Sequence, residues 1–362
     1  RWLEFRRVLF RSIKILTGYS WFIGMTLTKK SEGIYTDDSK IQILNELDSI
    51  IFDCDGVLID ITKSYDQTII KTTHYVLENL AKINSSIDVD FKIIDGFKST
   101  GGFNDEVDLT YAAIISLVAA KKLENDPTNF IFDVIKNSDF TGIVSVEKYI
   151  ENQTDISEIK KQLSYPGTHH DNPLYRIFDQ IFYGPELYQK LFNKTSNFSE
   201  PGLIEQDDVI LNDILIEKLL KKFNSKIAMV TGRGKESVRY SLQSLLTKFN
   251  LQNSMFLEDE SRELAKPNPK SLLNSINGFN SLTSLYVGDS MEDFIMAKKT
   301  TDSGNETIFC GIIGTSKNPQ GKLELFEKNN AILVLDSIHQ IGRAHVWTPV
   351  TDVSRIPSSS WT

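Results

Sequence analysis

The stretch Ser49–Val57 (SIIFDCDGV) decides the fold, because it joins a short apolar run to two carboxylates. The run is rich in Ile and Phe and ends in acidic residues and a glycine. This pattern is typical of a buried central strand whose carboxyl end opens into a loop. Residues i and i+2 of an extended chain face the same way, so Asp53 and Asp55 can converge while Cys54 points into the core. The stretch therefore predicts a strand end that carries two acidic groups.

Two different patterns follow this strand. Helical periodicity runs from about Thr62 to Ala81 and continues in further stretches to about Pro201, without runs typical of parallel strands. After Pro201, strands predicted at 226–230, 255–257, 282–287, 307–313 and 331–335 alternate with helices predicted at 208–223, 235–249, 269–276, 291–299 and 321–328. This alternation predicts right-handed crossovers and a doubly wound, parallel α/β sheet. We expect an α/β core of residues 45–62 and 203–340, with a mostly helical cap, residues 63–202, inserted after its first strand.

Both ends of the chain differ in composition from the middle. Residues 1–12 and 341–362 hold six of the ten arginines and three of the four tryptophans. A DNA string that encodes Trp2–Ser12 has a reverse complement that encodes Ile341–Val350 one frame over, if TGA is read as Trp. Both ends thus resemble a translated sequencing adapter. We expect residues 1–24 to be adapter-derived or upstream sequence and residues 341–362 to be a non-native tail, with Met25 a plausible true start.

Composition argues against several classes of protein. Apolar residues make up 40% and charged residues 24% of the chain, as in ordinary globular proteins. The formal charge of −8 argues against a nucleic-acid partner, because phosphate backbones attract basic patches. No apolar run reaches the roughly 20 residues that span a bilayer, so we expect no membrane association. The two cysteines, Cys54 and Cys310, fit a reducing cytoplasm rather than a disulfide scaffold.

Four polar clusters are expected at the carboxyl ends of the strands, where ligands bind in such sheets. They are Asp53–Val57 (DCDGV), Val230–Arg233 (VTGR), Lys266–Pro269 (KPNP) and Gly288–Asp293 (GDSMED). A hydroxyl and free backbone amides between a strand end and a helix start, as at Thr231, hold an anion well. Each cluster alone is more often structural: the first a turn, the second a turn glycine, the third a loop, and Asp289 a helix N-cap.

Taken together, the clusters indicate metal-assisted chemistry. Three or four carboxylates that converge on one sheet edge repel each other unless a divalent cation and a lysine offset them. Ligation dominated by carboxylate oxygens suits Mg²⁺, which commonly also binds a substrate phosphate. The sequence therefore predicts a magnesium site next to a bound phosphate.

The ordered set of four clusters resembles the haloacid dehalogenase superfamily of phosphohydrolases over roughly residues 45–340. Within it, the chain is similar to a phosphoglycolate-phosphatase-like group with a helical cap, whose cap motif resembles Lys98–Tyr111 (KSTGGFNDEVDLTY). The resemblance implies a Rossmann-like core, Mg²⁺ as cofactor and a small phosphorylated metabolite as substrate. It implies hydrolysis of a phosphoric monoester.

The resemblance also implies roles for single residues. Asp53 would be the nucleophile and a metal ligand. Asp55 would protonate the leaving alcohol and then activate water, with its backbone carbonyl on the metal. Gly56 would let the backbone turn sharply next to the phosphate. Asp289 would hold Mg²⁺ directly, and Asp293 either directly or through water.

The remaining implied roles concern the phosphate and the substrate. Thr231 would hydrogen-bond the transferring phosphoryl group, and Gly232 and Arg233 would bind substrate. Lys266 would pair with Asp53 and with phosphate oxygens.

In the cap, Lys98, Asn104 and Asp108 are expected to reach the other end of the substrate, with a solvated loop as the alternative. The pair His169-His170 lies in a polar loop, where histidines are usually just solvated. The aromatic residues Phe178, Phe182 and Tyr183 recur at helical spacing, which favours cap core over a binding stripe.

Two other functions stay open beside a phosphatase. A phosphomutase of the same fold would pass the phosphoryl group from Asp53 to a second substrate hydroxyl instead of water. A non-catalytic metabolite-binding regulator is less favoured, because all four motifs are intact. Dehalogenase activity is disfavoured, because the dehalogenases of the superfamily keep no acid at the position of Asp55.

Overall fold

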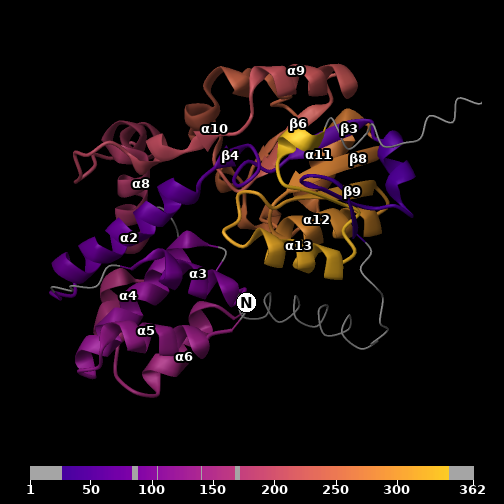
Figure 1. The fold of residues 1–362 in the computed structure, drawn as a ribbon. Coiled ribbons are helices and arrows are strands. Elements are labelled where there is room, and N and C mark those ends of the chain that lie inside the picture. Colours follow the sequence, from indigo (N-terminus) through magenta and orange to yellow (C-terminus); the bar gives the residue numbers. More distant parts are fainter. Residues whose placement is uncertain (1–26, 84–88, 104, 140, 168–171, 342–362) are drawn as a thin grey trace, which may run out of the picture. The chain divides into compact units, whose positions relative to one another are not determined.

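The structure is a computed structural model that describes residues 27–83, 89–103, 105–139, 141–167 and 172–341 (Figure 1). Within these ranges the chain forms two compact units. One consists of residues 61–207, and the other combines residues 27–60 with residues 208–341. The ends expected to be foreign lie outside the described residues, apart from Ile341.

The second unit is built on an eight-stranded sheet with the order β1-β2-β10-β9-β8-β3-β6-β7. Its strands are β1 (Leu27–Ser31), β2 (Ile34–Asp37), β3 (Ser49–Phe52), β6 (Ile227–Thr231), β7 (Met255–Phe256), β8 (Thr283–Gly288), β9 (Glu306–Ile312) and β10 (Leu333–Leu335). Neighbouring strands from β10 to β7 run parallel, whereas β2 pairs antiparallel with both β10 and β1. The predicted doubly wound α/β sheet is confirmed, with an antiparallel hairpin added at one edge.

Helices cover both faces of this sheet. They are α9 (Asp213–Lys222), α10 (Lys235–Leu242), α11 (Lys270–Phe279), α12 (Met291–Asp302) and α13 (Pro319–Lys328), with 3-10 turns η1 (Ile41–Asn45), η3 (Gln243–Lys248), η4 (Leu257–Asp259), η5 (Arg262–Leu264) and η6 (Ile338–Gln340). Ile51 joins the apolar cluster formed with α11, α12 and α13. Its neighbour Phe52 instead meets the ring of Phe249 edge-on, with centroids 6.3 Å apart. Adjacent residues of a strand face opposite sides, so β3 is apolar throughout because both of its faces are buried.

Strand β3 marks the point where the winding of the sheet reverses. It lies between β6 and β8, with Ile51 opposite Ala228 on one side and Tyr286 on the other. In open α/β sheets, ligands bind beyond the strand ends at such a switch point. Asp53 is the first residue after β3, and its backbone N–H donates to the carbonyl of Val287 at 2.8 Å. The fold therefore places Asp53 where a ligand is expected.

The other unit is helical. The chain leaves the sheet unit through β4 (Ile59–Asp60) and returns through β5 (Asp208–Val209), and these two strands pair antiparallel. Between them lie α2 (Thr62–Asn79), α3 (Phe91–Ser99), α4 (Glu106–Lys122), α5 (Pro127–Lys136), α6 (Ile143–Glu151), α7 (Ser157–Leu163), α8 (Pro173–Phe192) and η2 (Leu203–Gln206). Every residue of α4 from 107 to 120 is buried, as expected for a mainly apolar helix at the centre of a helical unit. The side chains of Phe178, Phe182 and Tyr183 are buried in the same core, which confirms their interpretation as core residues.

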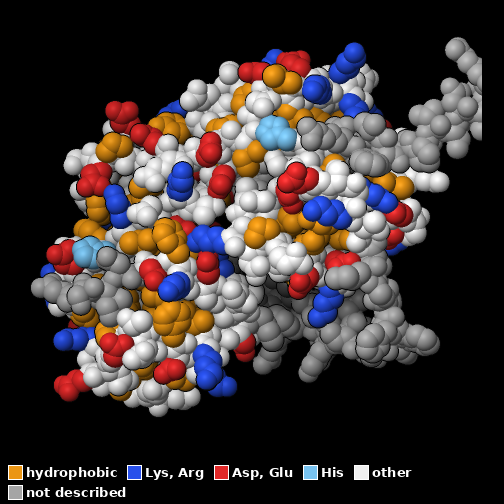
Figure 2. All heavy atoms as spheres, in the orientation of Figure 1, with side chains coloured by type: hydrophobic (Ala, Val, Ile, Leu, Met, Phe, Trp, Pro, Cys, Tyr) orange, Lys and Arg blue, Asp and Glu red, His pale blue; other side chains and the backbone are white. Residues whose placement is uncertain are grey.

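On the face shown in Figure 2, acidic and basic side chains are interspersed over the surface. Among the described helices, none combines the length and the apolar character that crossing a membrane requires.

Candidate active site

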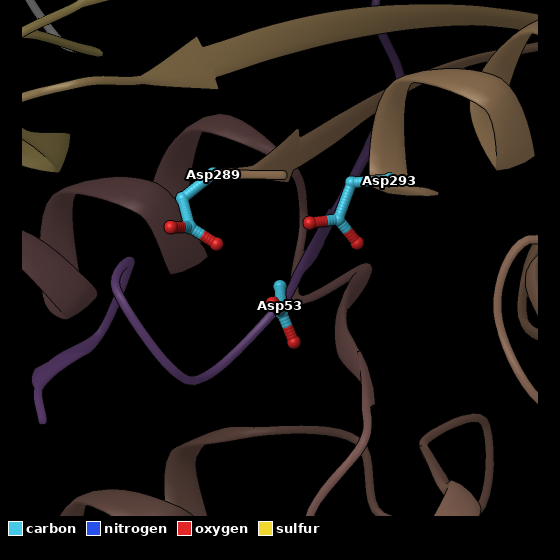
Figure 3. A group of neighbouring side chains, drawn as sticks. All are labelled: Asp53, Asp289 and Asp293. Atoms are coloured by element: carbon cyan, nitrogen blue, oxygen red, sulfur yellow. The ribbon is translucent and has the colours of Figure 1, made fainter. Parts of the chain in front are cut away.

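Three carboxylates converge at the carboxyl edge of the sheet (Figure 3). Asp53 follows β3, Asp289 follows the neighbouring strand β8, and Asp293 lies in the first turn of α12. One oxygen from each carboxylate lies within 4.8 Å of the corresponding oxygens of the other two. Asp53 and Asp293 are buried, and Asp289 is half-buried. The structure thus brings together the three side-chain carboxylates that were predicted to hold a metal, whereas Asp55 was expected to contribute its backbone carbonyl.

Two glycines make room for these carboxylates. At Gly56 the backbone φ is +71°, and a Cβ atom there would lie 2.6 Å from Oδ2 of Asp289. At Gly288 a Cβ atom would lie 2.5 Å from the Cβ of Asp293. A side chain at either glycine would therefore displace one of the acidic groups. The sharp turn predicted at Gly56 has this second purpose, which the sequence did not reveal.

Lys266 bridges two of the three carboxylates. Its Nζ lies 2.7 Å from Oδ1 of Asp53 and 2.8 Å from Oδ1 of Asp293, and its side chain is only 10% exposed. Burial alone would lower the pKa of this ammonium group, but the charges of Asp293 and Asp53 outweigh it and raise the pKa. The predicted KPNP loop therefore supplies a fixed positive charge to the buried side of the cluster.

The two carboxylates that share Lys266 differ in acidity. Burial raises the pKa of Asp53 to about 8, and three neighbouring carboxylates add to this rise against the opposing charge of Lys266. Burial also acts on Asp293, but the charge of Lys266 and hydrogen bonds from Lys266, Ser290 and Tyr286 lower its pKa. Lys266 therefore pairs with one carboxylate whose pKa is raised and with another whose pKa is lowered.

Asp293 is held rigidly at the start of α12. The Ser290 side chain accepts from the backbone N–H of Asp293 at 3.2 Å, and the N–H of Ser290 donates to Oδ2 of Asp293 at 3.1 Å, which completes a capping box. The hydroxyl of Tyr286 donates to Oδ1 at 2.7 Å. Ser290 is thus the N-cap, in place of the alternative at Asp289. Nothing in the strand pattern of the sequence distinguished Tyr286 from an ordinary core residue.

Asp55 forms an ion pair instead of joining the three carboxylates. Its Oδ1 lies 2.7 Å from Nε of Arg233, whose side chain is 3% exposed. The Nη1 of Arg233 donates to the Ser241 hydroxyl in α10 at 3.0 Å. Arg233, predicted to bind substrate, is therefore buried against Asp55. Thr231 is fully buried, and its hydroxyl accepts from the N–H of Arg233 at 3.3 Å.

Some of the backbone amides that were predicted to bind an anion after β6 already donate hydrogen bonds within the protein. The backbone N–H of Gly234 donates to Oε2 of Glu258, and that of Lys235 donates to Oδ2 of Asp259, both at 2.8 Å. The chain's own carboxylates thus occupy the amides that open α10, which are the groups an anion would otherwise use. A side chain at Gly232 would meet no other atom within 4 Å, so the loop is open at that residue. Glu258 and Asp259 follow β7 at the same edge of the sheet, and this position in the sequence could have indicated that they contact the start of α10.

The segment after β9 contributes two contacts that no sequence motif indicated. Lys322 in α13 has its Nζ 2.8 Å from Oδ2 of Asp289. The hydroxyl of Thr315 donates to the backbone carbonyl of Gly56 at 2.8 Å. Thr315 and Lys322 are polar residues that follow the end of β9, and that position could have indicated that they lie near the cluster.

The residues predicted in the cap belong to the helical unit. Lys98 lies in α3 with its Nζ 3.6 Å from Oε1 of Glu106. Asp108 is buried and accepts a hydrogen bond from the hydroxyl of Tyr165 at 2.5 Å. Asn104 and the pair His169-His170 lie outside the described residues.

Residues 211–301 match the family of haloacid dehalogenase-like hydrolases. This segment, about a quarter of the chain, includes Thr231, Lys266, Asp289 and Asp293, whereas Asp53 and Asp55 precede it. Over this segment the chain is therefore similar to haloacid dehalogenase-like hydrolases.

Solved structures with a similar fold include three described as phosphatases. A phosphatase from Thermococcus thioreducens has 20% identity and a TM-score of 0.50, over 78% of this chain and 99% of that one. A predicted phosphoglycolate phosphatase from Haemophilus somnus has 14% identity and a TM-score of 0.43, over 83% and 98%. A predicted phosphatase from Clostridium acetobutylicum has 12% identity and a TM-score of 0.40, over 83% and 98%. No curated protein sequence matches the chain.

Proposed function

We propose that the protein is a Mg²⁺-dependent phosphatase that hydrolyses a small phosphorylated metabolite through a covalent intermediate on Asp53. The observation that carries this proposal is the bridging position of Lys266 between Asp53 and Asp293, with Asp289 as the third carboxylate. The cluster offers a nucleophile, oxygen ligands for a cation and a fixed positive charge at the switch point of the sheet. The match of residues 211–301 to a family of hydrolases supports the reaction class.

The donor set fits Mg²⁺. Its ligands are carboxylate oxygens, which this hard cation prefers. Asp53 and Asp289 would hold the cation directly, together with the backbone carbonyl of Asp55. Asp293 already accepts hydrogen bonds at both of its oxygens, which favours contact through water. A bound cation would supply positive charge to the oxygens of the transferring phosphoryl group.

The side chains of the cluster would then divide the reaction into two displacements. A carboxylate oxygen of Asp53 attacks phosphorus, and the bond from phosphorus to the leaving oxygen breaks. Asp55 gives a proton to that oxygen and later takes one from water, which attacks phosphorus and releases Asp53. Lys266 and the hydroxyl of Thr231 would stabilise the negative charge on the remaining phosphoryl oxygens.

We also propose that the protein acts in the cytoplasm. The sequence holds only two cysteines, Cys54 and Cys310, both of them buried, and so few cysteines suit a reducing compartment.

The metal requirement is tested by replacing its best-placed ligand. With a panel of phosphorylated metabolites, we expect Mg²⁺-dependent release of inorganic phosphate, and we expect excess chelator to abolish it. Asp289→Asn should reduce turnover by about 10²-fold or more at fixed Mg²⁺, because a neutral amide binds the cation less strongly. Asp302→Asn, the same charge change at an exposed position in α12, should behave like the wild type. Full activity in chelator would remove the metal from the mechanism, and an isomer formed without free phosphate would indicate a mutase.

The role of Asp55 is tested by changing the leaving group. Asp55→Asn should slow hydrolysis of alkyl phosphates by about 10²–10⁴-fold, the usual contribution of proton transfer. In single-turnover experiments that follow the first displacement, the loss should be much smaller for aryl phosphates, because a phenolate needs little protonation to depart. An equal loss for both classes of substrate would argue against Asp55 as the acid.

A further inference from the structure

Lys322 is a second lysine at the acidic cluster. Its Nζ lies 2.8 Å from Oδ2 of Asp289, and its side chain is 19% exposed, compared with 10% for the bridging Lys266. Lys266 contacts the two buried carboxylates, whereas Lys322 contacts the half-buried one. The two lysines therefore contact different carboxylates of the cluster. Lys322 contacts Asp289, the most solvent-exposed of the three.

The position of Lys322 is built into the fold. Helix α13 begins after Asn318, whose side chain accepts from the N–H of Gly321 at 3.0 Å, so Lys322 lies in the first turn. The buried ring of Phe326 anchors the same helix in the apolar cluster of the sheet. Just before the helix, the hydroxyl of Thr315 holds the carbonyl of Gly56, the glycine that makes room for Asp289. The ammonium group is thus carried by a well-packed segment and not by a loose surface loop.

The contact concerns the carboxylate that is best placed to receive a cation. Asp293 accepts hydrogen bonds at both oxygens, and Asp53 is paired with Lys266. Among the described residues, Lys322 is the one that forms an ion pair with Asp289. A divalent cation bound to Asp289 would share that carboxylate with a positive charge a few ångströms away, and the two cations would repel each other.

We propose that Lys322 is a positioning residue that holds Asp289 in the metal-free protein and competes with the divalent cation for this carboxylate. Binding of the cation then displaces the ammonium group from Oδ2 of Asp289, so Lys322 lowers the affinity of the protein for the cation. The inference rests on the proposed function only in taking Asp289 as a cation ligand.

The test is a titration of the substrate-free, full-length protein with Mg²⁺, followed by isothermal calorimetry and by the shift in melting temperature. Lys322→Met should bind Mg²⁺ on the order of ten-fold more tightly than the wild type, because one repelling charge is removed near the ligand oxygens. Lys322→Arg, which keeps the charge, should stay close to the wild type. The control is Lys328→Met, an equal charge change at an exposed residue six positions further along α13, which should leave the affinity unchanged.

The outcomes separate this inference from the proposed function. If the wild type binds Mg²⁺ and Lys322→Met binds it equally or more weakly, the competitive role of Lys322 is wrong. If the wild type and all variants bind no Mg²⁺, the metal-dependent function fails as well. Should Lys322→Met not fold, Lys322→Gln removes the same charge but keeps a polar group that can hydrogen-bond to Asp289. It should likewise bind Mg²⁺ more tightly, and an unchanged affinity would overturn the inference.

Discussion

Replacing Asp53 with Asn is expected to abolish both turnover and covalent labelling by a phosphorylated substrate. An amide is a poor nucleophile, and loss of the nucleophile in covalent catalysis typically costs on the order of 10⁵–10⁶-fold in rate. The substitution keeps the size of the side chain at the end of β3, so the sheet around it should be preserved. The measurement is an acid quench of the wild type during turnover, followed by mapping of the labelled peptide.

Two controls make this result specific. Asp302→Asn, at an exposed position in α12, should be labelled and turn over like the wild type. Hydrolysis in ¹⁸O-labelled water reports on the second displacement: under multiple turnovers, attack at the Asp53 carbonyl carbon would place ¹⁸O in Asp53, whereas attack at phosphorus places it in the released phosphate. A label on any residue other than Asp53 would contradict the assignment, as would hydrolysis that leaves ¹⁸O in phosphate while no intermediate can be trapped.

Replacing Lys266 with Met is expected to give the largest loss of stability. With divalent cations chelated, the free energy of unfolding should fall by about 3–5 kcal/mol, the usual effect of removing one partner of a buried ion pair. The reason is that Asp53 and Asp293 share this ammonium group at 2.7 and 2.8 Å. Denaturant unfolding in the presence of chelator measures the loss.

A matched variant separates burial from charge. Lys226 forms an ion pair with Asp48 at 3.2 Å, but these side chains are 30% and 33% exposed. Lys226→Met should therefore lower the free energy of unfolding by no more than about 1 kcal/mol.

Added Mg²⁺ should reduce the loss of stability in Lys266→Met, because a cation at the cluster offsets part of the missing charge. The double variant Lys266→Met with Asp53→Asn should recover part of the stability, since one fewer carboxylate stays unpaired. Equal effects of the two lysine substitutions would contradict the buried position of Lys266.

The strands and helices of the sheet unit could be predicted because their signals are local. A strand buried on both faces must be apolar throughout, as in Ser49–Phe52, and its alternation with helical periodicity implies parallel crossovers. Parallel strands all end at the same edge, so the polar clusters that follow β3, β6 and β8 could be expected to meet. The hairpin of β1 and β2 was missed, because two short strands joined at Gly33 leave little periodicity to detect.

What the sequence determined by itself was thus the doubly wound sheet and the residue types gathered at its edge. The tertiary structure decided which of these side chains touch. It paired Asp55 with Arg233, placed Glu258 and Asp259 on the amides of α10, and brought Lys322 to Asp289 across 33 positions of the chain. These contacts depend on how helices pack on the sheet and on the direction each side chain takes from its element. A local sequence pattern predicts neither the packing of the helices nor the direction of the side chains, because both depend on neighbours that are distant in the sequence.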